Sequence, residues 1–271
     1  MVSVISAGLV FAAGAQSNLP AGPLERMAMI GASVTAGYIS SPIPGNTNTQ
    51  LCRLDHYLDA AVNAPHDPVR NFSGVLFFLQ AEDSGRSQID ATLQMKPTLI
   101  VGLDFLFWYC YGDHLTEPQR LEKFNRGLQV LEPIPCPLVL GDIPDASAAI
   151  GGMLSPGEMP ARATLAEANR RLRAWAGKHP RVSVVKLANF MQTIRTNGDI
   201  VVHGFPISKG GTPRLLQPDH LHLLPSGCAA LALAALDALP ATDTARKVRW
   251  DPKEVERLAT NSPPVATGQN H

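Results

Sequence analysis

The sequence predicts an α/β protein with a five-stranded parallel sheet between two layers of helices. Short apolar runs alternate along the chain with longer segments whose apolar residues recur at helical spacing. Strands that alternate with helices favour parallel pairing, because each strand is followed by a crossover helix. Residues 98–104 are rich in Leu, Ile and Val and indicate a central strand covered on both faces. The expected strands are residues 27–30, 68–72, 98–104, 136–140 and 182–187.

The segments between these strands carry the helical pattern. Leu121, Phe124 and Leu128 fall on one face of residues 117–131, which is typical of an amphipathic helix packed on a sheet. The alanine- and leucine-rich residues 226–239 indicate a helix that closes the domain. The expected helices are residues 51–61, 88–95, 117–131, 160–178, 190–196 and 226–239.

The chain of 271 residues is long enough for one substantial core, so we expect a single α/β domain over residues 23–240. Residues 241–271 are polar and contain Pro263-Pro264, which indicates a poorly ordered C-terminal tail.

Residues 1–22 are largely apolar and indicate a signal peptide or a disordered N-terminus. Ala13-Gly14-Ala15 fits the small-x-small pattern of a signal-peptide cleavage site, which favours export to the periplasm or out of the cell. No Lys or Arg precedes Arg26, so the basic start of a signal peptide is missing. A cytoplasmic location is therefore the alternative.

The composition argues against several classes of partner. The formal net charge is zero and only 17% of the residues are charged, which gives no reason to expect nucleic acid or an anionic membrane surface. The sequence has no run of about 20 apolar residues, so we expect no stable membrane insertion. Its four cysteines lack metal-ligand spacing, and an exported chain could pair Cys52 with another cysteine.

The stretch MAMIGASVTAGY, residues 27–38, carries the candidate nucleophile. Its apolar start is an expected strand that ends at Gly31, and a helix is expected to begin just after Ser33. A serine at this point lies at the carboxyl edge of a parallel sheet, where α/β proteins bind ligands. Helix-start N–H groups there can stabilise a developing negative charge. The alternative role of Ser33 is to cap the helix.

A second stretch, PDHLHLLPSG at residues 218–227, carries the candidate base. A nucleophilic serine needs a base within hydrogen-bond reach, and the base needs a third group to orient it. Asp219 and His222 are three residues apart, just before an expected helix start at Pro225. We expect His222 to face Ser33 with Asp219 behind it, and His220 to point elsewhere.

These two stretches resemble the first and last conserved blocks of the SGNH/GDSL hydrolase superfamily, a Gly-Asp-Ser motif after the first strand and an Asp-x-x-His motif before a helix. The resemblance covers residues 27–239. It implies a three-layer α/β/α sandwich of the flavodoxin-like kind. It also implies a serine hydrolase that cleaves a carboxylic ester through an acyl-serine, with Ser33, Asp219 and His222 as catalytic residues and no cofactor or metal.

The two middle blocks of the family supply donors to the oxyanion, and here the match is weaker. The first is a glycine after the second strand, for which Gly74 is the first choice and Gly85 the competitor. The second is Gly-x-Asn-Asp, and this chain has Asp104 in the place of the asparagine. Asp104 could serve there as a neutral acid, or it could turn away and make a structural hydrogen bond. Ala32 also replaces the aspartate that usually precedes the serine.

Two other enzyme classes fail on pattern. An α/β-hydrolase elbow needs Gly-x-Ser-x-Gly, and position 35 is Thr35. A dinucleotide site needs Gly-x-Gly-x-x-Gly, which residues 31–36 do not fit. The alternatives that stay open are a non-catalytic domain that binds a carbohydrate or an acyl group, and an acyltransferase that uses the same triad. The expected substrate is a small-molecule or glycan ester.

Overall fold

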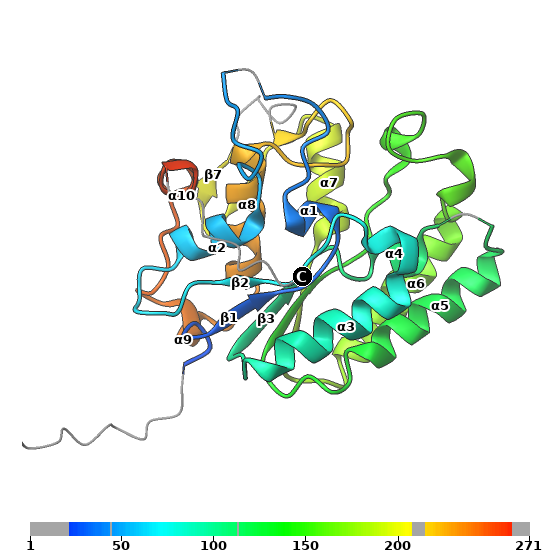
Figure 1. Ribbon diagram of the computed structural model, residues 1–271, viewed down its shortest axis with the longest axis horizontal. Helices are drawn as coiled ribbons and strands as arrows, with labels where there is room; N and C mark the ends of the chain where they lie inside the picture. The colour runs from blue at the N-terminus through cyan, green and yellow to red at the C-terminus, as the bar shows by residue number, and fades with distance from the viewer. Residues whose placement is uncertain (1–21, 44, 113, 208–214, 262–271) are drawn as a thin grey trace, which may run out of the picture.

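The computed structural model describes residues 22–43, 45–112, 114–207 and 215–261 (Figure 1). At its centre is a five-stranded sheet in the order β2-β1-β3-β4-β5, and every neighbouring pair is parallel. This is the flavodoxin-like order, so the predicted fold class is confirmed. The strands are β1 (Met27–Met29), β2 (Arg70–Asn71), β3 (Leu99–Gly102), β4 (Leu138–Gly141) and β5 (Val182–Val185).

Helices cover both faces of the sheet. Figure 1 shows α3, α5 and α6 on one side, and α2, α8 and α10 on the other. The longer helices are α2 (Leu54–Ala61), α3 (Ala81–Gln94), α5 (Glu117–Val130), α6 (Arg162–Ala176), α7 (Leu187–Arg195), α8 (Pro225–Asp237) and α10 (Pro252–Asn261). The short ones are α1 (Ser33–Ala36), α4 (Phe107–Cys110) and α9 (Ala241–Thr244).

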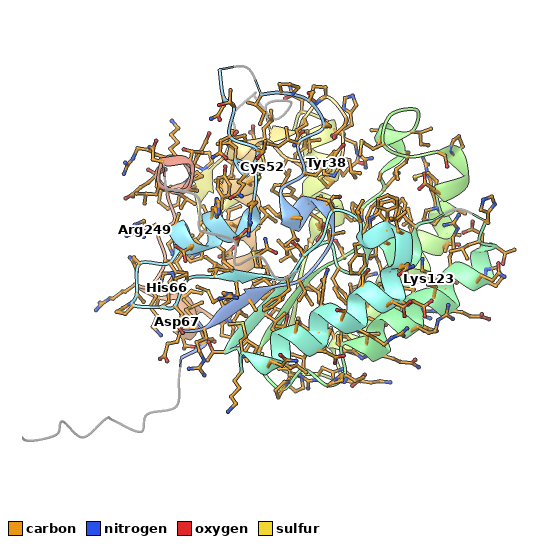
Figure 2. The ribbon with its side chains drawn as sticks, in the orientation of Figure 1. Tyr38, Cys52, His66, Asp67, Lys123 and Arg249 are labelled. Carbon is orange, nitrogen blue, oxygen red and sulfur yellow. The ribbon has the colours of Figure 1, made fainter. Side chains whose placement is uncertain are left out.

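The strand sequences divide the core into two halves. Successive side chains of a strand point to opposite faces of a sheet. Met27 and Met29 accordingly lie in the apolar cluster under α2, α7, α8 and α10, whereas Ala28 and Ile30 lie in the cluster under α3, α5 and α6. Figure 2 labels Cys52 on the first side and Lys123 on the second. A sheet buried on both faces explains why the strands read as continuous apolar runs.

The C-terminal region differs from the prediction. The expected poorly ordered tail is wrong for residues 241–261, because they contain α9 and α10. Val255 of α10 has none of its surface exposed, and Ala259 is also buried against the core. Apolar residues at helical spacing drive this packing, although the segment is polar on average. Residues 262–271 lie outside the described part of the chain, as do residues 1–21 with most of the predicted signal peptide.

A small hairpin consists of β6 (Val201–Val202) paired antiparallel with β7 (Phe205–Pro206). Among the described helices, none combines the length and the apolar character that a bilayer crossing needs.

Candidate active site

Ser33 is the first residue of α1 and lies directly beyond the carboxyl end of β1. The turn that leads to it depends on Gly31, whose φ of 146° is rarely adopted by residues with a side chain. A Cβ at this position would also clash with the carboxylate of Asp104. The buried amide of Gln88 fixes the same turn, because it accepts from the Gly31 N–H at 2.8 Å and donates to the Gly31 carbonyl at 2.9 Å.

The structure brings the three predicted catalytic residues together. The Ser33 Oγ lies 2.8 Å from Nε2 of His222, and the His222 Nδ1 lies 2.7 Å from Oδ2 of Asp219. Both distances are those of good hydrogen bonds. The other Asp219 oxygen accepts the backbone N–H groups of Leu221 and His222. The turn that carries the histidine is therefore folded around the carboxylate that orients it.

The charge on Asp219 sets the tautomer of His222. Burial raises the pKa of Asp219, but the hydrogen bonds from the His222 side chain and from the backbone outweigh burial and bring the pKa to about 2. The carboxylate is therefore ionised at neutral pH and accepts a hydrogen bond from the Nδ1–H group of His222. Nε2 is then left as an acceptor for the Ser33 hydroxyl, which is the arrangement that a general base needs.

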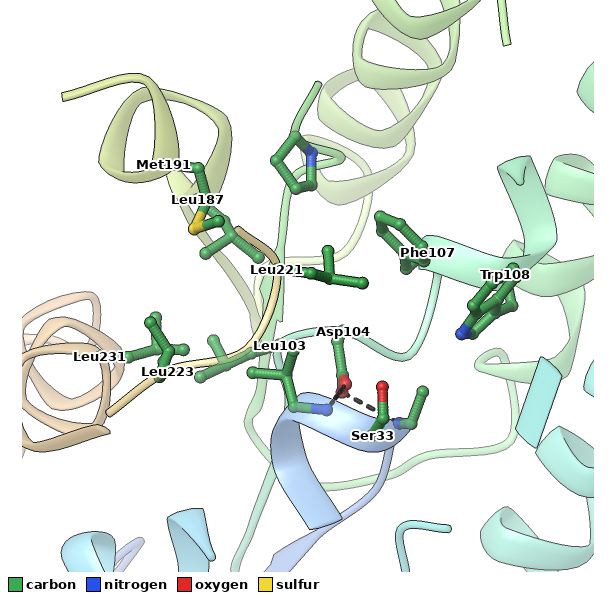
Figure 3. A pocket seen from close by; sticks show the side chains of 13 residues that line it. Ser33, Leu103, Asp104, Phe107, Trp108, Leu187, Met191, Leu221, Leu223 and Leu231 are labelled. Carbon is green, nitrogen blue, oxygen red and sulfur yellow. Dashed lines mark hydrogen bonds between the residues drawn. The ribbon is translucent and has the colours of Figure 1, made fainter. Parts of the chain in front are cut away.

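Asp104 is a hydrogen-bond acceptor in the structure and not a donor to an oxyanion. Its carboxylate accepts the backbone N–H groups of Ala32, Val34 and Thr35 at 2.9–3.2 Å and the Thr35 hydroxyl at 2.6 Å. Figure 3 shows the carboxylate next to the turn that bears Ser33. Negative charge at a helix N-terminus is favourable because it meets unpaired N–H groups. The structure thus gives Asp104 the second of the two roles that the sequence left open, a structural one.

Neither candidate oxyanion glycine offers a free N–H group. Gly74 follows β2, as expected, but its N–H donates to the Gly31 carbonyl at 3.1 Å, so the choice of Gly74 does not hold in this structure. Gly85 lies inside α3, where a Cβ would clash with the Tyr109 hydroxyl. Its small size serves the packing of two helices. The Ser33 N–H, in contrast, has no hydrogen-bond partner among the described residues.

Gln217 holds the histidine turn against the nucleophile segment, and sequence reasoning missed it. Its side-chain oxygen accepts the N–H and the hydroxyl of Ser40, and its amide group donates to the carbonyls of Tyr38 and Leu223. Its backbone N–H donates to the His222 carbonyl. Gln217 is only 2% exposed. A polar residue two places before Asp219 gave no periodic or spacing signal of this role.

Tyr38 adds an aromatic contact to this junction. Its ring centroid lies 4.7 Å from that of His222, in a tilted arrangement. Figure 2 shows Tyr38 beside α1, at the end of the stretch that begins with β1. The His222 side chain is only 1% exposed, so packing as well as hydrogen bonding fixes its position.

An apolar pocket opens beside Ser33 at the carboxyl edge of the sheet (Figure 3). Its walls come from both helical layers, with Phe107 and Trp108 of α4 facing Leu187 and Met191 of α7. The cavity is small, about 30 Å³, which is room for roughly two water molecules. Of the aromatic residues that follow Asp104, Phe107 and Trp108 line the pocket, and Tyr109 and Tyr111 are buried.

Other polar residues near the strand ends make structural contacts or line other grooves. Asp142 accepts the N–H of Ala188 at the start of α7, and Asp145 accepts that of Ser147 two residues on, so the first stabilises a helix start and the second a local turn. His220 lines a separate groove, which agrees with the expected register of the Asp-x-x-His motif. All four cysteines are free thiols, and the described residues contain no cluster of three or more His, Cys, Asp or Glu side chains placed to hold a metal ion.

The chain has the α/β fold of SGNH/GDSL-like hydrolases, as the sequence resemblance predicts. Its structural neighbours are lipases, acylhydrolases and acetylxylan esterases of this kind, all at low sequence identity. No protein-family model matches the sequence. No curated protein matches it either.

Three solved structures illustrate the likeness. A lipase/acylhydrolase from Enterococcus faecalis superposes with a TM-score of 0.52 at 16% identity, over 78% of this chain and 93% of that one. A gut microbial diltiazem-metabolizing enzyme gives 0.51 at 16% identity, over 83% of this chain and 49% of that one. A variant of an acetyl-xylooligosaccharide esterase from Geobacillus gives 0.50 at 17% identity, over 81% and 96%. At such identities the likeness establishes the fold alone.

Proposed function

We propose that this protein is a serine hydrolase that cleaves a carboxylic ester through an acyl-serine intermediate. The observation that carries the proposal is the continuous chain of contacts from Ser33 through His222 to Asp219, at 2.8 and 2.7 Å, beside an apolar pocket. A nucleophile, a base and an orienting carboxylate in this order are the parts that acyl transfer to serine requires.

The proposed reaction has two halves. In the first, the Ser33 oxygen attacks the ester carbonyl while His222 Nε2 takes the hydroxyl proton, and the carbonyl π electrons move onto oxygen. The tetrahedral intermediate collapses, the bond to the alcohol breaks, and His222 gives its proton to the leaving oxygen. In the second half, water attacks the acyl-serine with His222 again as base, which releases the acid and restores Ser33.

The pocket suits the acyl part of a small ester. Its lining is apolar except for Ser33, Asp104 and the indole N–H of Trp108, and the carboxylate of Asp104 is already occupied by four hydrogen bonds. An alkyl chain gains free energy by leaving water for such a site. The volume of about 30 Å³ favours a short chain over a long one. Esters of short apolar acids are therefore the proposed substrates.

The test measures turnover of p-nitrophenyl esters from acetate to decanoate by the protein and by two serine variants. Ser33→Ala should lose activity by at least about a thousandfold, because no other group can form the acyl intermediate. Ser73→Ala is the matched control, since Ser73 follows the neighbouring strand and its hydroxyl donates to Asn71. Equal activity in Ser33→Ala and the parent would contradict the proposal. Binding of esters without turnover would favour the non-catalytic alternative.

A further inference from the structure

The proposed reaction leaves negative charge on the ester oxygen, and the donors expected to hold it are missing from this structure. The Gly74 N–H is engaged with Gly31, and Asp104 accepts hydrogen bonds where the family has an asparagine donor. Only the N–H of Ser33 is left of the three expected groups. An oxyanion held by one donor is poorly stabilised, since each donor is worth on the order of a hundred- to a thousandfold in rate.

The pocket itself supplies one further donor. Apart from Ser33, its side chains are Ala, Val, Leu, Phe, Pro, Met, the acceptor Asp104, and Trp108. The indole N–H of Trp108 is therefore the one side-chain donor besides the Ser33 hydroxyl among the described residues that line this pocket. It comes four residues after Asp104 along the chain, in α4, the helix that follows the loop in which the family has its asparagine donor.

The indole N–H of Trp108 is unpaired and accessible, as expected of a group that donates to a bound ligand. The residue is only 8% exposed, yet the indole nitrogen has no hydrogen-bond partner within the described structure. It is also not among the fully enclosed polar atoms, so it reaches open space. Figure 3 shows the nitrogen on the edge of the ring that faces Ser33. A buried tryptophan usually finds a partner for its N–H, and this one faces the pocket without one.

The neighbouring rings hold the indole in place. The Phe107 ring lies edge-on at 5.2 Å between centroids, and the Phe78 ring lies tilted at 5.5 Å. Trp108 belongs to α4, which begins just after the loop that leaves β3. Its donor is thus fixed before a substrate arrives, which is what makes electrostatic stabilisation of a transition state effective.

We propose that the Trp108 indole N–H donates a hydrogen bond to the oxyanion, together with the Ser33 N–H, in place of the asparagine that this chain lacks. This inference rests on the proposed ester hydrolysis at Ser33. It assigns Trp108 a catalytic role, since the indole touches the reacting oxygen, and it assigns Asp104 to the support of the nucleophile turn. The binding of the alcohol and acyl groups needs no contribution from the indole nitrogen.

The test is Trp108→Phe, which keeps an aromatic ring in the pocket and removes the donor. We expect kcat to fall by about a hundredfold or more, with KM changed by less than about threefold, because the lost bond is made chiefly in the transition state. Trp175→Phe is the matched control, since the indole of Trp175 donates to Glu132 at an exposed position and does not line the pocket. The kcat and KM of this control should equal those of the parent.

A second measurement separates catalysis from packing. An alkylboronic acid forms a tetrahedral adduct with a reactive serine, and its affinity should fall by the same factor as kcat in Trp108→Phe. A rise in KM with kcat unchanged, or unchanged boronate affinity in a variant that melts at the parent temperature, would overturn the inference. Full turnover in Ser33→Ala would instead overturn the proposed function, so the two failures are distinguishable.

Discussion

Asp104 makes structural contacts at a position where the SGNH/GDSL sequence pattern has an asparagine. The sequence places it where a relative would have a neutral donor, and the structure shows a carboxylate that accepts four hydrogen bonds from residues 32–35. The turn has no aspartate of its own, because Ala32 stands in that place. The anion that stabilises the turn comes instead from Asp104, in the loop that follows the neighbouring strand β3.

Asp104→Asn tests this role. An amide keeps one acceptor oxygen but turns an N–H₂ group toward backbone donors, so the free energy of unfolding should fall by about 2–3 kcal/mol. Activity should fall as well, because the turn that positions Ser33 is loosened. Urea unfolding and ester kinetics on the same preparation measure both effects. An increase in kcat on restoring the asparagine would contradict the structural role.

Asp219 should make stability depend on pH. An unfolded aspartate has a pKa of about 3.9, and the folded chain lowers this pKa to about 2. A lowered folded-state pKa stabilises the protein above the unfolded value, and the contribution is lost as the pH falls through the folded value. Relative to the parent, Asp219→Asn should therefore be less stable by on the order of 2 kcal/mol at pH 6, and the gap should narrow between about pH 4 and pH 2.

Unfolding by urea at several pH values checks this expectation, with Asp90→Asn on the exposed face of α3 as the control. A gap between parent and Asp219→Asn that stays constant down to pH 2 would contradict the assignment of the charge to Asp219.

At the scale of elements, the strands and the chemistry at their ends could be predicted, and the connections between distant segments could not. The apolar residues around Ile100 indicate a strand, and the glycine and serine at residues 31–33 indicate a turn, each from neighbouring residues alone. The contacts of Gln88 with Gly31 and of Gln217 with Ser40 join residues 57 and 177 positions apart, and no local pattern reports them. Helix α10 was missed because its apolar face is narrow and its average polarity is high.

Gln217 carries the element-scale prediction. Gln217→Met keeps the length of the side chain but leaves donors and acceptors of Tyr38, Ser40 and Leu223 without partners, which should cost about 2–4 kcal/mol of stability. It should also lower kcat at least tenfold, because the turn that carries His222 is no longer held in position relative to α1, which carries Ser33. Gln192→Met, on the exposed side of α7, is the control. Loss of stability with unchanged kcat would limit Gln217 to a structural role.

At the scale of the whole molecule, the parallel sheet gathers the site. The carboxyl ends of β1 and β3 bring Ser33 and Asp104 together, and α4 and α7, from opposite layers, enclose the pocket between them. Asp219 and His222 come from a segment nearly 190 residues further along the chain. The fold was predictable from the strand pattern, which places Ser33 at the carboxyl edge of the sheet. The pairing of Asp219 with His222 was predictable from their spacing of three residues before a helix start. The oxyanion donors were not, because they depend on which N–H groups the folded backbone leaves free.

The central claim is that Ser33 is the residue that becomes acylated. The most direct measurement is peptide mass spectrometry of the protein after reaction with an alkyl fluorophosphonate, which forms a stable adduct with an activated serine. We expect a single adduct on Ser33, and no labelling of Ser33→Ala, whose unfolding transition should match that of the parent. An adduct on any other serine, or equal labelling in Ser33→Ala, would contradict it.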